Sequence, residues 1–272
     1  MAVPDVRLNN GAAIPRLGLG LWLNKNEETC KAAVKHALES GYRHFDTAQI
    51  YANEAFLGAA LKEAKIPRQD VFITTKIWNE NLWWDGFDPS FDESLEKLQT
   101  DYVDLLLIHF PVTNQRRPAW YKMEEKFKKG QAKAIGVSNY TVTHLEELLR
   151  ECSVKPSVNQ VELHVFLQQP DLVEYCRQHD IVVEAYSPLA HGYHMDDPIL
   201  RQVANKHSKT TAQIMIRWCL EQGLVVLPKS ANKDRIAENI DVFDFSLDQE
   251  DMVKLKTLDR NFRTAWDPTH VT

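Results

Sequence analysis

The chain has 272 residues, 44% of them hydrophobic, and a formal net charge of −6. This length allows one or two domains, and the ordinary hydrophobic fraction predicts a globular core rather than disorder. The acidic balance argues against nucleic acid as a partner, because non-specific binding of nucleic acid needs a basic surface.

No segment of the sequence has the pattern of a targeting or membrane-spanning segment. Residues 1–10 carry Asp5, Arg7 and two asparagines where a signal peptide would have an apolar core. The longest apolar runs, such as residues 103–108, are too short to cross a bilayer. The four cysteines form no C-x-x-C pair, which is typical of reduced thiols. We therefore expect a cytoplasmic protein with no membrane partner.

The N-terminal segment predicts a β-hairpin, after which short apolar strands alternate with amphipathic helices. Asn9, Asn10 and Gly11 separate residues 6–8 from residues 12–14, and Asn-Gly supplies the positive φ angles of a tight turn. Thr143, with Glu146 three residues later, predicts a capping box. The predicted strands are residues 17–20, 42–46, 71–76, 103–109, 132–138, 157–162, 181–186 and 224–228. The predicted helices are residues 27–39, 54–63, 93–98, 121–129, 144–150, 172–179, 212–221, 234–240 and 249–258.

This alternation predicts either a barrel or a long doubly wound sheet. The count of eight strands, each followed by a helix, favours the barrel. A doubly wound sheet usually carries a G-x-G-x-x-G fingerprint, and Gly18-Leu19-Gly20 lacks the third glycine. We therefore predict an α/β protein in which residues 1–272 form a single (β/α)8 TIM barrel domain with an N-terminal β-hairpin, a fold that takes about 250 residues.

Polar residues follow three adjacent predicted strands, at the end of the barrel where this fold places its reactive groups. The second strand ends at Asp46, the third at Lys76 and the fourth at His109, and Tyr51 lies shortly after Asp46. A lysine after an apolar strand is costly unless it is paired, so Asp46 is its expected counter-charge. A cation beside Tyr51 favours the phenolate and lowers the pKa of this tyrosine, which suits a general acid near neutral pH. His109 is expected to supply a hydrogen bond to the same oxygen.

Three motifs give the chain a specific resemblance to a known family. Residues 41–54 (GYRHFDTAQIYANE) resemble the signature of the aldo-keto reductase family, and residues 101–105 (DYVDL) with 109–111 (HFP) are similar to its second signature. Residues 227–230 (LPKS) with Arg235 resemble its third. The resemblance runs from the N-terminal hairpin to Arg263. It implies an enzyme that reduces aldehydes and ketones to alcohols, with NADPH as the hydride donor.

The same resemblance implies roles for individual residues. Tyr51, Asp46, Lys76 and His109 match the family's catalytic tetrad, with Tyr51 as the proton donor and His109 orienting the carbonyl. The residues that match its NADPH site are Ser138, Asn139 and Gln160 at the nicotinamide carboxamide, Tyr186 under the nicotinamide ring, Ser187 and Leu189 along the pyrophosphate, Lys229, Ser230 and Arg235 at the adenosine 2′-phosphate, and Glu238 and Asn239 at the adenine.

Aromatic residues on the predicted loops at the catalytic end indicate the kind of substrate. Trp22, Trp78 and Phe110 are expected to contact a small-molecule carbonyl substrate. Trp83 and Trp84 either join them or pack under their own loop. An apolar pocket with a few polar groups favours aromatic or medium-chain aldehydes and α-keto esters over free sugars.

The sequence departs from the family pattern near the expected substrate site. Leu21 stands where the family often has a small hydroxyl residue, so a cofactor contact through that side chain is lost. The loops at residues 112–120 and 191–198 are short, and so is the tail after Arg263. Because these segments normally frame the substrate, the resemblance does not determine the physiological substrate. It implies a monomer, which is the family's usual state.

Two other functions stay open at this point. His44 and Asp46 share one strand as H-x-D, which suits a zinc or manganese hydrolase, as would the polar cluster of His191, His194, Asp196 and Asp197. Lys76 would repel such a cation, so we expect no metal. A non-catalytic NADPH-binding regulatory subunit would keep the cofactor residues, but the intact tetrad argues against this function.

Overall fold

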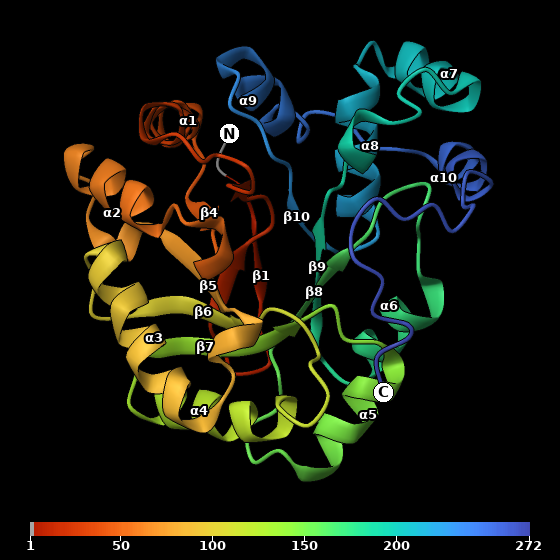
Figure 1. Ribbon diagram of the computed structural model, residues 1–272. Coiled ribbons are helices and arrows are strands. Elements are labelled where there is room, and N and C mark those ends of the chain that lie inside the picture. Colours follow the sequence, from red (N-terminus) through yellow and green to blue (C-terminus); the bar gives the residue numbers. More distant parts are fainter. Residues whose placement is uncertain (1–2) are drawn as a thin grey trace.

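The computed structural model describes residues 3–272 and contains an eight-stranded parallel sheet rolled into a barrel (Figure 1). The strands are paired in chain order, and isolated bridges between Leu17 and Val226 and between Gly20 and Lys229 join the first strand to the last. The predicted barrel fold is therefore confirmed. Its strands are β3 (Leu19–Gly20), β4 (His44–Asp46), β5 (Phe72–Ile77), β6 (Val103–Ile108), β7 (Ala132–Ser138), β8 (Val158–Glu162), β9 (Val182–Tyr186) and β10 (Val225–Leu227).

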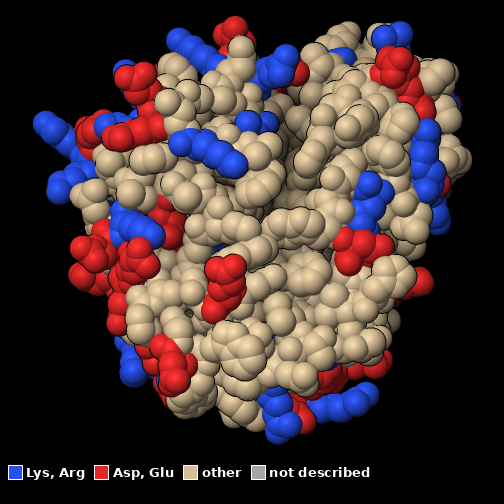
Figure 2. Space-filling view, in the orientation of Figure 1, with Lys and Arg blue, Asp and Glu red and all other residues tan. Residues whose placement is uncertain are grey.

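Helices surround the barrel in Figure 1, and charged side chains gather mainly toward the rim of the face drawn in Figure 2. No helix among residues 3–272 is long and apolar enough to span a membrane. The α-helices are α1 (Glu27–Ser40), α2 (Glu54–Glu63), α3 (Trp84–Leu98), α4 (Arg116–Lys128), α5 (Val142–Glu151), α6 (Pro170–Gln178), α7 (Pro198–His207), α8 (Thr211–Glu221), α9 (Lys233–Ile240) and α10 (Gln249–Lys256). Short 3₁₀ helices are η1 (Gln49–Tyr51), η2 (Arg68–Asp70), η3 (Asn79–Asn81) and η4 (Ala190–Gly192).

Three helices differ from the sequence prediction by more than two residues, each beside a proline. Helix α3 begins at Trp84 rather than at residue 93 and contains Pro89, because Phe87 and Phe91 are fully buried and tertiary packing holds the turn around the proline. Helix α4 begins at Arg116 rather than at residue 121, with Pro118 in its first turn, where a backbone N–H has no helical acceptor. Helix α7 was not predicted, although Pro198 at its start and the Asp197 cap are ordinary start signals.

Two predicted local motifs also take a different form. The capping box of α5 is made by Thr141 and His144 rather than by Thr143 and Glu146, because the helix begins two residues earlier. In the hairpin loop only Gly11 has a positive φ, of 89°, and its N–H donates to the carbonyl of Leu8 at 3.0 Å. The turn thus needs glycine at one position instead of positive φ angles at both Asn10 and Gly11.

The N-terminal hairpin covers the end of the barrel where the strands begin. Its strands β1 (Asp5–Arg7) and β2 (Ala13–Pro15) pair antiparallel. Leu8 and Ile14 pack inside the barrel against Phe72, Leu105 and other apolar side chains. Because one end is filled in this way, the opposite end, where the parallel strands finish, is left for polar side chains.

Alternation along each strand divides the side chains between two cores. In β6, Leu106 and Ile108 face the surrounding helices, whereas Leu105 and Leu107 face the barrel interior. The interior is apolar near the hairpin and polar toward the strand ends, where His109 follows β6. This gradient positions the candidate site.

Candidate active site

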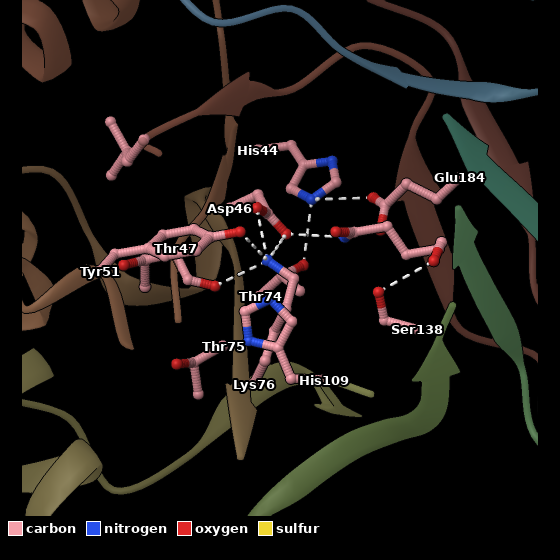
Figure 3. A network of polar contacts seen from close by, with 12 residues as sticks. His44, Asp46, Thr47, Tyr51, Thr74, Thr75, Lys76, His109, Ser138 and Glu184 are labelled. Atoms are coloured by element: carbon pink, nitrogen blue, oxygen red, sulfur yellow. Dashed lines mark hydrogen bonds and ion pairs between the residues drawn. The ribbon is translucent and has the colours of Figure 1, made fainter. Parts of the chain in front are cut away.

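The four residues of the predicted tetrad meet at the C-terminal ends of neighbouring strands (Figure 3). Asp46 ends β4, Lys76 lies near the end of β5, and His109 directly follows β6. Tyr51 is the last residue of η1, which follows β4. All four side chains are buried, and Lys76 is fully so. The sequence therefore placed these residues in one cluster correctly, and the structure supplies their contacts.

Lys76 and Asp46 form a buried ion pair at the centre of this cluster. Lys76 Nζ donates to Asp46 Oδ1 at 2.6 Å and to Asp46 Oδ2 at 2.7 Å. It also donates to the carbonyl oxygen of Thr47 at 2.9 Å and lies 3.4 Å from the hydroxyl oxygen of Tyr51. Burial raises the pKa of Asp46, although the charge and hydrogen bonds of Lys76 oppose this effect. The pair places a fixed cation beside the Tyr51 hydroxyl.

The pKa of Tyr51 moves in the direction opposite to the sequence prediction. Burial raises this pKa well above its ordinary value, and the negative charge of Asp46 raises it further. The predicted lowering by Lys76 is wrong chiefly because burial penalises the phenolate, and also because Asp46 lies closer to the ammonium than Tyr51 does and offsets its charge. Tyr51 is therefore protonated at neutral pH, which is the state that a proton donor requires.

His109 is a neutral imidazole beside this hydroxyl. Burial lowers the pKa of His109 well below its ordinary value, and the positive charge of Lys76 lowers it further. The ring centroids of His109 and Tyr51 are 5.6 Å apart. A neutral imidazole has one N–H donor, and within residues 3–272 its Nδ1 has no hydrogen-bond partner. Tyr51 and His109 can together hold a ligand oxygen by two donors.

Four of the predicted nicotinamide-site residues lie next to the tetrad. Ser138 Oγ donates to the carbonyl oxygen of Gln160 at 2.9 Å, and Tyr186 donates from its hydroxyl to Asn139 Oδ1 at 2.8 Å. Asn139 Nδ2 donates to the carbonyl oxygen of His109 at 3.0 Å. Asn139 has a positive φ of 63°, a conformation that asparagine tolerates. The ends of β7, β8 and β9 are thus hydrogen-bonded to one another beside the catalytic candidates.

The remaining predicted cofactor residues follow β9 and β10. Ser187 has a positive φ of 49°, and Leu189 packs against the core. Lys229, after β10, is exposed at the surface, and partial burial of its ammonium lowers its pKa. Ser230 is buried nearby, and α9 begins with the cap Asn232, whose Oδ1 accepts from the backbone N–H of Arg235 at 3.0 Å.

Helix α9 carries three of these residues. Arg235 is exposed, Asn239 is buried, and Glu238 Oε1 accepts from the hydroxyl of Thr210 at 2.7 Å. A lysine, an arginine and the start of a helix thus lie along one stretch of chain. Positive side chains and backbone N–H groups at a helix start are suited to a phosphate group.

Aromatic rings line the region in front of the tetrad. The ring centroid of Trp22 lies 4.8 Å from that of Tyr51, and that of Trp78 lies 5.2 Å from that of His109. A further tryptophan, Trp266, was missed by the sequence prediction. Its ring centroid lies 5.4 Å from Trp78, 5.7 Å from His109, 6.3 Å from Trp22 and 6.2 Å from Phe110. Trp266 therefore joins the three predicted substrate residues to the tetrad.

The other two tryptophans of this region lie elsewhere. Trp83 and Trp84 are more than half exposed at the start of α3, and the ring of Trp84 lies 3.9 Å from Nζ of Lys122. Neither of the two sequence interpretations, a place in the pocket or packing under the loop, describes them.

Glu162 holds the C-terminal tail that carries Trp266. Glu162 is fully buried at the end of β8, and its carboxylate accepts from Thr264 N at 2.7 Å, Thr264 Oγ1 at 2.5 Å and Ala265 N at 3.0 Å. Burial opposes ionisation, but hydrogen bonds from His164, Thr264 and Ala265 lower the pKa of Glu162 overall. The position of Glu162 at the end of a predicted strand could have marked it as a candidate site residue. No signal in the sequence indicated that Trp266, more than a hundred residues from Glu162, lies beside the tetrad.

The metal-hydrolase interpretation receives no support from the geometry. Both carboxylate oxygens of Asp46 contact the ammonium of Lys76. His44, which shares the strand with Asp46, contacts Pro15 and Thr74. Across residues 3–272, no group of three or more histidine, cysteine or acidic side chains is arranged to hold a metal ion.

We predict that Lys76→Met destabilises the protein by about 3 to 5 kcal/mol, because it leaves the buried Asp46 carboxylate without a counter-charge. Urea unfolding at neutral pH measures this loss. Lys97→Met is the matched control, since Lys97 forms an exposed pair with Glu93 at 2.7 Å and its loss should change stability far less. Equal effects of the two substitutions would contradict the importance of the buried pair.

Comparison with known proteins agrees with this geometry. The family model described as Aldo/keto reductase family matches residues 16–260. The chain is 45% identical over 263 residues to glyoxal reductase of Bacillus subtilis (strain 168), covering 97% of this chain and 95% of that protein. It is 46% identical over 275 residues to methylglyoxal reductase DkgA of Escherichia coli (strain K12), covering 98% of each. The crystal structure of a Bombyx mori aldo-keto reductase in complex with NADP has a TM-score of 0.90 and 35% identity, covering 97% of this chain and 95% of that chain. Because these matches span nearly the whole sequence, the chain belongs to the aldo/keto reductase family.

Proposed function

We propose that this protein reduces small aldehydes and ketones to alcohols with NADPH, and that Tyr51 donates the proton. The observation that carries the proposal is the protonated Tyr51 hydroxyl held 3.4 Å from the Lys76 ammonium and next to the neutral ring of His109. Bound NADPH would supply a hydride to the carbonyl carbon. The Tyr51 O–H bond then breaks as its proton passes to the carbonyl oxygen, which yields the alcohol and a phenolate.

Each residue of the cluster has a distinct part in this step. The Lys76 ammonium stabilises the phenolate as it forms, so that a tyrosine with a raised pKa can still give up its proton. Asp46 holds the Lys76 ammonium in place through two hydrogen bonds. His109 donates to the carbonyl oxygen and orients it toward Tyr51. Burial of all four groups excludes water, which strengthens these interactions.

The donor set around the barrel mouth fits NADPH. Ser138, Asn139 and Gln160 would hold the carboxamide, and Tyr186 would stack on the nicotinamide ring. The pyrophosphate would lie along residues 187–189, and the 2′-phosphate would meet Lys229, Ser230 and Arg235. Glu238 and Asn239 would contact the adenine. The bound NADP of the Bombyx mori relative supports this assignment.

The substrate we propose is a small carbonyl compound with an apolar or conjugated group. Trp22, Trp78 and Phe110, with Trp266, present aromatic surface in front of the tetrad. Such a surface suits aromatic and medium-chain aldehydes and α-keto esters better than hydrated free sugars. Two relatives are named for glyoxal and methylglyoxal, so 2-oxoaldehydes belong to the same proposal.

We further propose that residues 1–272 work as one domain and as a monomer in the cytoplasm. The strands that join into one sheet extend from Leu19 to Leu227, which leaves no part of the barrel to a second domain. The net charge of −6 gives no support for a nucleic-acid partner, and no membrane partner is proposed.

Tyr51→Phe should lower the rate of reduction by about 10² to 10⁴, because it removes the proton donor but keeps the ring. NADPH consumption with benzaldehyde or methylglyoxal measures the rate, and a fluorescence titration should show that NADPH still binds. Tyr140→Phe is the control, since this buried hydroxyl has no hydrogen-bond partner among residues 3–272. Wild-type turnover by Tyr51→Phe would refute the proposed mechanism.

NADPH should bind more tightly than NADH by a factor on the order of 10², since two charged contacts to the 2′-phosphate contribute about 3 kcal/mol after screening. Arg235→Ala should remove much of this difference and leave NADH binding nearly unchanged. Lys233→Ala removes a charge from the same exposed helix turn and is the control. Fluorescence titrations of both cofactors test this, and added salt should weaken NADPH binding more. Equal affinities in the wild type would exclude a 2′-phosphate site.

Trp266→Ala should raise KM for benzaldehyde about three- to tenfold, since an aromatic contact contributes roughly 0.5 to 1.5 kcal/mol beyond burial. The effect on KM for methylglyoxal should be smaller, because that substrate has no ring to contact Trp266. Trp83→Ala, at an exposed position, should leave both values unchanged. Steady-state kinetics with benzaldehyde, methylglyoxal and glucose measure these KM values and the substrate preference. A preference of the wild type for glucose over benzaldehyde would contradict the proposed substrate class.

A further inference from the structure

A second buried carboxyl group, Glu184, lies inside the barrel next to the tetrad, and the mechanism above does not use it. Glu184 belongs to β9 and is fully buried. Gln160 connects it to the tetrad, because Gln160 Nε2 donates to Glu184 Oε2 at 2.6 Å and to Asp46 Oδ2 at 2.8 Å. His44 and Glu184 lie on the same side of this network in Figure 3.

The hydrogen bonds of His44 indicate that Glu184 carries a proton. His44 Nδ1 lies 3.3 Å from the carbonyl oxygen of Pro15, so this nitrogen bears the hydrogen and Nε2 is an acceptor. Nε2 lies 3.1 Å from Thr74 Oγ1 and 3.5 Å from Glu184 Oε1. Within residues 3–272, Glu184 Oε1 accepts no hydrogen bond, and its contact with His44 Nε2 is not itself a hydrogen bond in this arrangement. An ionised Glu184 Oε1 would thus face the lone pair of His44 Nε2, which repels it. A protonated Oε1 would instead direct its hydrogen toward that lone pair.

The charges around Glu184 favour the same state. The ionisable groups that face it are His44 and Asp46 of β4, Lys76 of β5 and Tyr51 of η1, while the neighbouring strands place Gln160 and Val225 beside it. Burial lowers the pKa of His44 to about 3, so His44 offers no positive charge. Lys76 is already paired with Asp46. Burial and the charge of Asp46 raise the pKa of Glu184 to about 8.

The carboxyl groups of Glu184 and Asp46 also determine the orientation of the Gln160 side chain. Both contacts made by Gln160 Nε2 are to carboxyl oxygens, so the amide nitrogen must face Asp46 and Glu184. The amide carbonyl oxygen of Gln160 therefore faces the other way, and no donor within residues 3–272 occupies it, so it can accept from a ligand N–H. The nicotinamide carboxamide has such N–H groups.

We propose that Glu184 is a positioning residue whose protonated carboxyl, held between His44 and Gln160, orients the Gln160 amide for the nicotinamide and keeps a second negative charge away from Lys76 and Tyr51. The cofactor part of this inference rests on the proposed function, whereas the protonation of Glu184 does not. When Glu184 loses its proton, the added negative charge opposes formation of the Tyr51 phenolate. The rate of reduction then falls as the pH rises past about 8.

The protonation is tested by stability alone, without cofactor or substrate. Glu184 has an ordinary pKa of 4.5 and a folded-state pKa of about 8, so the folded wild type holds a proton that the unfolded chain has lost between these values. Wild-type stability therefore falls as the pH rises through this window. Glu184→Gln cannot ionise, so its Tm minus that of the wild type should increase from about pH 4.5 to about pH 8 and then level off.

Glu162→Gln is the matched control for this measurement, because hydrogen bonds lower the pKa of that buried carboxyl. A lowered pKa adds stability that is present above the unfolded pKa and lost as the pH falls through the folded pKa. The Tm of Glu162→Gln minus that of the wild type should therefore become more negative as the pH rises to about 4.5 and stay constant from there to about pH 8. A Glu184→Gln difference that is constant or falls with pH would overturn the protonation of Glu184.

The positioning role is tested by NADPH binding and by the pH profile of turnover. Glu184→Gln keeps an acceptor for Gln160 and a donor for His44, so NADPH affinity should stay within about threefold, whereas Glu184→Leu should weaken it about tenfold by releasing the amide. The fall in kcat past about pH 8 should be absent in Glu184→Gln. Wild-type affinity in Glu184→Leu would overturn the positioning role, and so would an unchanged alkaline fall in Glu184→Gln. If the Leu variant does not fold, the pH profile of the Gln variant decides alone. Failure of the reductase proposal would appear separately, as no NADPH-dependent reduction of benzaldehyde or methylglyoxal by the wild type, while the stability test of Glu184 would still be decided.

Discussion

The ion pair between Lys76 and Asp46 is the interaction on which the rest of the candidate site depends. Burying an unpaired ammonium in the barrel interior would cost several kcal/mol in lost hydration. Lys76 Nζ offsets that cost with its two contacts to the Asp46 carboxylate and one to the carbonyl oxygen of Thr47. Such a pair adds little net stability, but it fixes a charge where water cannot screen it. The hydroxyl of Tyr51 and the ring of His109 both lie within the field of this charge.

Charge balance in the barrel interior explains the protonation states of the neighbouring groups. One ammonium and one carboxylate already neutralise each other, so any further charge would be buried without a partner. His44 and His109 are therefore neutral, and Tyr51 keeps its proton. The same argument explains why a simple expectation about a lysine beside a tyrosine fails here. A lysine lowers the pKa of a neighbouring tyrosine less when a carboxylate is already paired with that lysine.

Access to this interior depends on a segment far away in sequence. The C-terminal tail is held by backbone and side-chain hydrogen bonds to Glu162, at the end of β8. This contact brings Trp266 against Trp22, Trp78 and His109. Because the tail meets the barrel through a few hydrogen bonds and aromatic contacts, the shape of the proposed substrate region depends on the tail as well as on the barrel. Family membership alone therefore leaves the substrate undetermined.

The sequence by itself determined the barrel and grouped the four residues of the candidate tetrad. Strand periodicity, turn residues and the rule that reactive groups follow barrel strands are local signals, so Asp46, Lys76 and His109 could be grouped before any coordinates were known. The tertiary structure decided the start of α3, where burial of Phe87 and Phe91 outweighs Pro89. It also decided the direction of the Tyr51 pKa shift, the place of Trp266 and the contacts of Glu184. These features depend on partners supplied by other strands and by the tail. A contact between two segments far apart in the sequence produces no periodic pattern in either segment, so it cannot be predicted from them.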